Sequence, residues 1–202
     1  MRIVGGQWRG RRLAEPRGRE VTRPTTDRVR EACASMADSA LEGGIEGARV
    51  LDAFAGSGAM GIEMLSRGAA FAHFFDIDRG AAALVRRNLS DLGAAPSTWR
   101  ATCGDVLAAS ARGRVAGGPY DLVIIDPPYA LGPAPALELL SALDEAGALA
   151  PGAVALIERE TSSEPARPRG FEVVREKHYG STSVDLLRYT PSPEPDSEEE
   201  HA

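Results

Sequence analysis

The feature that most constrains the fold of this chain is the stretch at residues 50–61, VLDAFAGSGAMG. An apolar run ends in an acidic residue, Asp52, and a glycine-rich turn and a run of helix-forming residues follow. This order predicts a strand, a tight loop and the start of a helix, which is where open α/β sheets bind nucleotide-like ligands. The sequence therefore favours an α/β fold with a ligand site after its first strand.

Asp52 narrows the class of ligand more than the glycines do. Gly56, Gly58 and Gly61 match the G-x-G-x-x-G pattern of dinucleotide sites, and Asp76 follows at about the twenty-residue distance that such sites require. In a dinucleotide site the turn holds a doubly charged pyrophosphate, which the Asp52 carboxylate would repel. A cation would be attracted, so we expect S-adenosylmethionine, which carries a sulfonium and an ammonium group, rather than NAD. The alternative is a tight turn that binds no ligand.

Strand and helix patterns alternate along the rest of the chain. Two late apolar runs are joined by Gly180-Ser181 and predict an antiparallel hairpin, which distinguishes a methyltransferase sheet from a dinucleotide-binding one. We therefore expect an α/β fold, a Rossmann-like seven-stranded S-adenosylmethionine-dependent methyltransferase sheet with helices on both faces. The expected strands are 49–52, 71–76, 97–102, 120–125, 152–158, 171–179 and 183–189, and the expected helices are 59–66, 79–92, 134–146 and one that begins near Thr25 or Thr26 and ends at Gly43-Gly44.

Charge is distributed unevenly. The net charge is −6, yet residues 1–30 hold nine arginines against three acidic residues, a balance of +6, so the remainder carries −12. A basic arm on an acidic body favours contact between the arm and a polyanion, and the alternative is an ordinary solvated face. Residues 1–14 alternate short apolar and basic residues around glycines, which predicts a small β-hairpin that carries Trp8. We divide the chain into a basic hairpin or arm (1–20), a methyltransferase domain (21–190) and a disordered acidic tail (191–202).

Composition excludes several other classes of protein. No run approaches the roughly eighteen apolar residues of a membrane span, and the first residues lack the apolar core of a signal peptide, so we expect a cytoplasmic protein. The two cysteines and three histidines show no metal-ligand spacing, and we expect no metal. A chain of 202 residues buries one substantial core, and we expect a monomer.

The second motif, Asp126-Pro127-Pro128-Tyr129, follows the clearest buried strand, YDLVII. Two prolines stiffen the loop and supply no N–H donors, so the loop presents acceptors, namely the Asp126 carboxylate and the Pro127 carbonyl. Two acceptors suit an exocyclic amine of a nucleobase, and Tyr129 could stack on that base. We expect an in-line methyl transfer driven by positioning and electrostatics. The alternative is a proline-stiffened turn with a chance tyrosine.

Five segments together carry a family resemblance: RIVGGQWRGRRL, RPTTDRVREA, LDAFAGSGAMGIEMLSRGA, DPPY and YGSTSVDLLRY. They resemble the ribosomal RNA small subunit methyltransferase D family over most of residues 1–190. The resemblance implies S-adenosylmethionine as donor, N2 of a guanine as acceptor, and small-subunit (16S) rRNA or an assembled or assembling 30S particle as substrate. The resemblance and the two motifs together supply the expected site residues. These are Asp126, Pro127, Pro128 and Tyr129 for catalysis; Thr25, Arg28, Asp52, Phe54, Gly56, Ser57, Gly58, Asp76, Ile77, Asp105 and Val106 for the cofactor; and Arg2, Trp8, Arg9, Arg11 and Arg12 for RNA.

Several alternatives stay open at this point. Asp78 could replace Asp76 on the ribose, and Asp105 could simply cap a helix. Arg28 could be a surface ion-pair partner, and Trp8 could pack the hairpin onto the domain rather than stack on a base. At the level of function, the rivals are a DNA amino-methyltransferase that modifies adenine or cytosine and a non-catalytic RNA-binding assembly factor.

Overall fold

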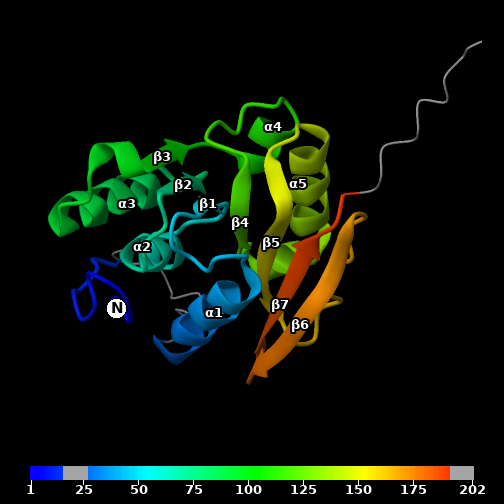
Figure 1. The fold of residues 1–202 in the computed structure, drawn as a ribbon, viewed down its shortest axis with the longest axis horizontal. Helices are drawn as coiled ribbons and strands as arrows, with labels where there is room; N and C mark the ends of the chain where they lie inside the picture. The colour runs from blue at the N-terminus through cyan, green and yellow to red at the C-terminus, as the bar shows by residue number, and fades with distance from the viewer. Residues whose placement is uncertain (16–26, 192–202) are drawn as a thin grey trace, which may run out of the picture.

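The computed structural model describes residues 1–15 and 27–191 and contains a seven-stranded sheet (Figure 1). The strand order is β3-β2-β1-β4-β5-β7-β6, in which β1 to β5 run parallel and β7 is antiparallel to both its neighbours. The expected methyltransferase sheet with its closing antiparallel hairpin is confirmed. The strands are β1 Arg49–Asp52, β2 Phe71–Asp76, β3 Trp99–Cys103, β4 Tyr120–Ile125, β5 Leu149–Glu160, β6 Phe171–Tyr179 and β7 Thr182–Tyr189.

Helices cover both faces of this sheet because strand residues alternate between two apolar clusters. In β4, Leu122 and Ile124 belong to the cluster that contains the apolar sides of α1, α2 and α3. Val123 and Ile125 belong to the opposite cluster, with α4 and α5. This period of two is what a strand that is buried on both faces requires. The helices are α1 Asp27–Ala40, α2 Ala59–Ser66, α3 Arg79–Leu92, α4 Val106–Ser110 and α5 Ala134–Glu145, with short 3₁₀ turns η1 Pro96–Thr98 and η2 Tyr129–Leu131.

The N-terminal segment packs against α2. Ile3 and Leu13 are buried in the cluster on this face, and the amides of Val4 and Gly5 donate to the two carboxylate oxygens of Glu63, each at 2.8 Å. Glu63 is fully buried and also pairs with Arg67. Residues 1–15 are thus held by the domain through an internal carboxylate.

Four sequence expectations differ from the structure by more than one residue. The hairpin expected over residues 1–14 is reduced to one isolated bridge between Arg2 and Arg12, because several of the segment's amides donate within local turns or to α2. The third strand begins two residues later than expected, since Pro96 starts a 3₁₀ turn. The strand expected at 152–158 extends over Leu149–Glu160. The first helix ends at Ala40 rather than at Gly43-Gly44, and its expected caps, Thr25 and Thr26, lie outside the described residues.

None of the helices in the described part of the chain is long and apolar enough to cross a membrane.

Candidate active site

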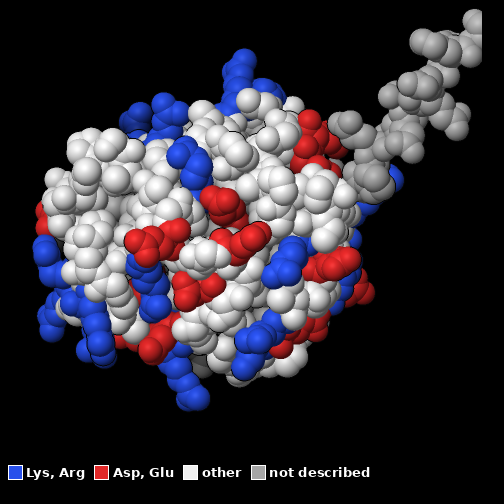
Figure 2. Space-filling view, in the orientation of Figure 1, with Lys and Arg blue, Asp and Glu red and all other residues white. Residues whose placement is uncertain are grey.

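Acidic residues end several parallel strands at one edge of the sheet. Asp52 and Asp76 are the last residues of β1 and β2, Asp126 follows β4, and Glu158 lies near the end of β5. The strand order reverses between β1 and β4, which is the position where ligands bind in open α/β sheets. Figure 2 shows Asp and Glu side chains gathered near the middle of the face where Figure 1 has the loop after β1.

Gly56, in the turn after β1, and Gly61, in α2, are needed for different reasons. Gly56 has a φ of +54°, and a Cβ built there meets no atom within 4 Å, so the turn borders open space. At Gly61, a Cβ would lie 2.4 Å from the ring of Phe74 and 2.9 Å from Asp52 Oδ2. Gly56 therefore permits the turn, and Gly61 permits the close packing of α2 on the strands.

Asp52 is a buried carboxylate that forms no ion pair with any residue in the ranges 1–15 and 27–191. Its side chain is 3% exposed, and its Oδ2 accepts a hydrogen bond of 2.9 Å from the amide of Gly61. Burial, with a smaller contribution from the charge of Asp76, raises the pKa of Asp52 to about 7, against the Gly61 hydrogen bond. A cation beside this carboxylate would be stabilised.

Asp76 and Asp78, the two candidates for the ribose, have different roles. Asp78 is the N-cap of α3 and accepts from the amide of Ala81 at 2.9 Å. Asp76 accepts from the amides of Gly56 and Asp78, each at 2.8 Å, and so ties the glycine turn to β2. Between them, Ile77 is 76% exposed, an unusual position for a large apolar side chain next to a polar edge.

Asp105 caps α4, the alternative that the sequence left open. Its Oδ1 accepts from the amides of Leu107 and Ala108, at 2.9 and 3.3 Å. Val106, expected at the cofactor, is buried against the cluster that contains α5. Capping employs one carboxylate oxygen, so it is compatible with a second contact at the other.

The loop after β4 carries the Asp126 carboxylate. Asp126 is half-buried and forms no hydrogen bond or ion pair within the described residues. Burial raises its pKa well above the usual carboxyl range, and the charges of Glu158 and Asp52 add to the effect. Pro128 is exposed, and its carbonyl accepts from Leu131 and closes the turn at η2, while Pro127 is buried.

Tyr129 is anchored at its hydroxyl and open at its ring. The hydroxyl donates to Glu158 Oε1 at 3.3 Å and lies 3.1 Å from Thr182 Oγ1, while the side chain is 39% exposed. Burial is the largest cause of its raised pKa. An aromatic ring fixed at its polar end and exposed on its faces is suited to stacking.

Glu158 is the residue of this site that sequence reasoning missed. It is 6% exposed, and in the register of β4 and β5 Ile125 pairs with Ile157, so Asp126 and Glu158 follow side by side. Its charge also contributes to the raised pKa of Cys33, which lies on α1, after the larger effect of burial. The only sequence signal was a glutamate at the end of an apolar strand, which by itself is common.

Among the residues expected to close over the ligands, Thr25 lies outside the described residues, and Arg28 is exposed. Asp27 is paired by Arg2 and Arg30 rather than by Arg28. Phe54 and Ser57 are half-buried in the loop after β1, and Ser57 contributes its carbonyl to a hydrogen bond from Asn88.

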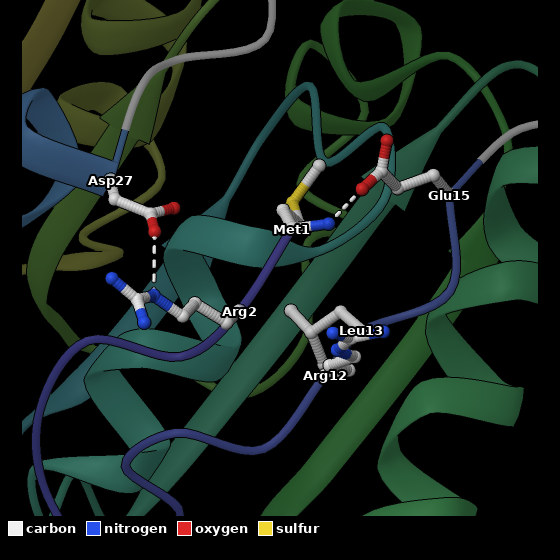
Figure 3. A pocket seen from close by; sticks show the side chains of 6 residues that line it. All are labelled: Met1, Arg2, Arg12, Leu13, Glu15 and Asp27. Carbon is white, nitrogen blue, oxygen red and sulfur yellow. Dashed lines mark hydrogen bonds and ion pairs between the residues drawn. The ribbon is translucent and has the colours of Figure 1, made fainter.

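The five residues expected to contact RNA have different surroundings. Arg9, Arg11 and Arg12 are exposed, and Arg11 donates to the carbonyl of Asp91. Arg2 is exposed but pairs with Asp27 beside a surface hollow, where Figure 3 shows it on the side opposite Glu15. Trp8 is half-buried and packs against the core, so the packing alternative holds for part of its surface.

The comparison with known families agrees with this geometry. Residues 1–188 match the family model described as Conserved hypothetical protein 95. The chain belongs to this family. A member of the expected subgroup, ribosomal RNA small subunit methyltransferase D of Escherichia coli strain K12, is 36% identical over 201 residues, which cover 98% of this chain and 94% of that protein. The protein of the same name from Haemophilus influenzae is 32% identical over 189 residues, 93% of each chain.

The family likeness extends to the folded structure. The solved structure of the Escherichia coli protein yhhF, described as a methyltransferase, superposes with a TM-score of 0.80 at 36% identity, over 95% of this chain and 99% of that one. The expected family membership is thus confirmed over both the N-terminal segment and the strands that carry the candidate site.

Proposed function

We propose that this protein is an S-adenosylmethionine-dependent methyltransferase that modifies N2 of a guanine in small-subunit (16S) rRNA, on an assembled or assembling 30S particle. The observation that carries the proposal is the Asp126 carboxylate, which has no hydrogen-bond or ion-pair partner among residues 1–15 and 27–191. Two prolines follow it, and it lies at the switch point beside a glycine turn. The relatives named above are small-subunit rRNA methyltransferases, which favours the same class of substrate.

The chain's own residues fit the proposed cofactor. Bound S-adenosylmethionine would supply a methyl group on a positively charged sulfur. Asp52 is buried and has no cation beside it in the described part of the chain, so it would face the charged methionine end of the cofactor. The open turn at Gly56 would leave space for the methionine moiety. Asp76, the last residue of β2, would accept from the ribose hydroxyls. Ile77 and Val106 would flank the adenine, with Asp105 accepting from its amino group.

Asp126 and Pro127 would hold the amine that is methylated. The N2 lone pair of guanine is conjugated with the ring, so the amine is a weak nucleophile. Acceptors for both of its hydrogens would fix its orientation and favour a more tetrahedral nitrogen. The amine would lose a proton as the N–C bond formed and the C–S bond of the donor broke. The ionised Asp126 carboxylate would take this proton, and its raised pKa makes it a stronger base. Tyr129 would stack on the base once it has left its own stack.

The exposed arginines of the N-terminal segment would bind phosphates. Arg9, Arg11 and Arg12 lie on a segment that Glu63 fixes to α2, so their charges keep a constant position relative to the site. Phosphate contacts position RNA without reading its sequence.

Labelled S-adenosylmethionine with 30S particles, naked small-subunit rRNA and DNA, followed by nucleoside analysis, tests the proposal. We expect N2-methylguanosine in RNA. Asp126→Asn should lower the rate at least about 100-fold and leave cofactor affinity within about twofold, because it removes a charge from the base side only. Methylated adenine or cytosine in DNA would refute the proposed acceptor, and loss of cofactor binding in Asp126→Asn would refute the division of roles.

A further inference from the structure

Glu158 is an acidic residue of the candidate site, and the proposed methyl transfer assigns it no role. The acceptors for the two amine hydrogens come from the loop after β4, and the candidate cofactor residues lie on the other side of β4. Glu158 nevertheless sits almost completely buried on the neighbouring strand, in hydrogen-bond contact with Tyr129.

The register of β4 and β5 places the Glu158 carboxylate beside Asp126, at the same edge of the sheet. Ile125 and Ile157 are paired neighbours on β4 and β5, so the next residue of each strand carries its carboxylate at the same edge. Tyr129 bridges the two strands, because it follows Asp126 in the loop and its hydroxyl reaches Glu158. Any base that stacks on Tyr129 with its amine at Asp126 therefore has Glu158 near the same edge of the base.

Nucleobases differ at the ring nitrogen next to the exocyclic amine. In guanine that atom, N1, bears a hydrogen and is a donor. In adenine the ring nitrogen next to the amine, N1, is an acceptor, and in cytosine the corresponding N3 is also an acceptor. A carboxylate accepts hydrogen bonds only, and a site built for a donor strongly rejects an analogue that lacks it.

We propose that Glu158 selects guanine as the target base by accepting a hydrogen bond from its N1–H, beside the amine held by Asp126. This inference rests on the proposed function, and it gives that function a base-specificity residue. Each carboxylate oxygen can accept more than one donor, so the Tyr129 hydroxyl and the base can be bound together. The charge of Glu158 disfavours the ionised form of Asp126, and hydrogen-bond donors between the two carboxylates would offset this repulsion.

The probe is 2-aminopurine, which keeps the 2-amino group of guanine but has an unprotonated N1. After the methylated nucleotide has been mapped, 30S particles reconstituted with rRNA that carries guanine or 2-aminopurine at that position are compared by kcat/KM. We expect the wild type to prefer guanine by at least about 100-fold. Glu158→Gln can donate to an unprotonated N1 through its amide, so its preference should fall by about tenfold or more. The lost O6 affects all variants alike and cancels from the change in preference.

Tyr129→Phe is the matched control. It removes the hydroxyl that contacts Glu158 and retains the ring and the carboxylate, so it should lower the rate on both bases and leave the preference for guanine unchanged. Cofactor binding and thermal unfolding of each variant show that the fold is intact. A Glu158→Gln variant that methylates guanine with an unaltered preference would overturn the inference while the proposed function stands. A wild type that methylates adenine or cytosine would overturn both.

Discussion

Protonation of Asp52 should control the affinity for the cofactor. Burial raises the pKa of this carboxylate to about 7 in the ligand-free protein, and the sulfonium and ammonium groups of S-adenosylmethionine are attracted only to its ionised form. Half of Asp52 is then ionised at pH 7, but only about 3% at pH 5.5. The dissociation constant should therefore rise about 16-fold between pH 7 and pH 5.5, which corresponds to about 1.6 kcal/mol.

Isothermal titration calorimetry with wild type, Asp52→Asn and Asp126→Asn measures this effect. The asparagine oxygen at position 52 can still accept from the Gly61 amide, so the turn keeps its hydrogen bond. We expect Asp52→Asn to bind weakly with little dependence on pH in this range. Asp126→Asn should keep the pH dependence of the wild type. The cofactor's own ammonium stays mostly protonated up to pH 7 and does not contribute to the difference.

Two results would refute this reasoning. A wild-type affinity that is constant from pH 5.5 to pH 7 would mean that Asp52 is ionised throughout or does not meet the cation. An Asp52→Asn variant with the full 16-fold dependence would assign the titration to another group. NAD binding in preference to S-adenosylmethionine would contradict the charge argument altogether.

Three further predictions concern packing and the RNA surface. Gly61→Ala should destabilise the protein by about 1–3 kcal/mol in urea unfolding, because the new Cβ would lie 2.4 Å from the Phe74 ring. The control variant Gly104→Ala should be nearly neutral, because its Cβ would have its nearest contact at 3.8 Å. Equal stability of the two variants would contradict this packing. Glu63→Ala should lower the free energy of unfolding by about 2–4 kcal/mol and expose the N-terminal segment to trypsin, because two amides and Arg67 lose their buried partner. Protection from trypsin equal to that of the wild type would show that other contacts hold the segment. Changing Arg9, Arg11 and Arg12 together to Gln should reduce the salt dependence of RNA binding by about two to three counterions. The control variant, Arg112→Gln with Arg114→Gln in the exposed loop after α4, should keep the salt dependence of the wild type. If filter binding at several salt concentrations gave the triple variant the same slope as the wild type, the N-terminal segment would be excluded as a phosphate contact.

The fold was predictable because its determinants are local. The run from Tyr120 to Ile125 is apolar on both faces, and such a run is a buried parallel strand wherever helices flank it. The strand–turn–helix unit at Gly56 and the late hairpin at Gly180 are likewise specified by neighbouring residues. The boundaries that differed have separate causes. At Pro96 a 3₁₀ turn delays the start of β3, whereas pairing with β4 and β7 extends β5 at its two ends.

The N-terminal segment shows where local reasoning stops. Alternating residues and glycines predicted a hairpin, but several of its amides find their acceptors on α2, far along the chain. A buried carboxylate such as Glu63 competes successfully for these amides because leaving either group unsatisfied inside the protein is costly. Trp8 consequently packs against the core over part of its surface.

The sequence by itself determined most of the chemical groups of the candidate site: Asp52 after one strand, Asp126 to Tyr129 after another, and a glycine turn between strand and helix. Only the tertiary structure decided which carboxylates act on one another. Glu158 lies 32 positions after Asp126, and the pairing of β4 with β5 makes them neighbours. Electrostatic interaction depends on distance in space and on burial, and both are properties of the packed sheet rather than of the order of residues.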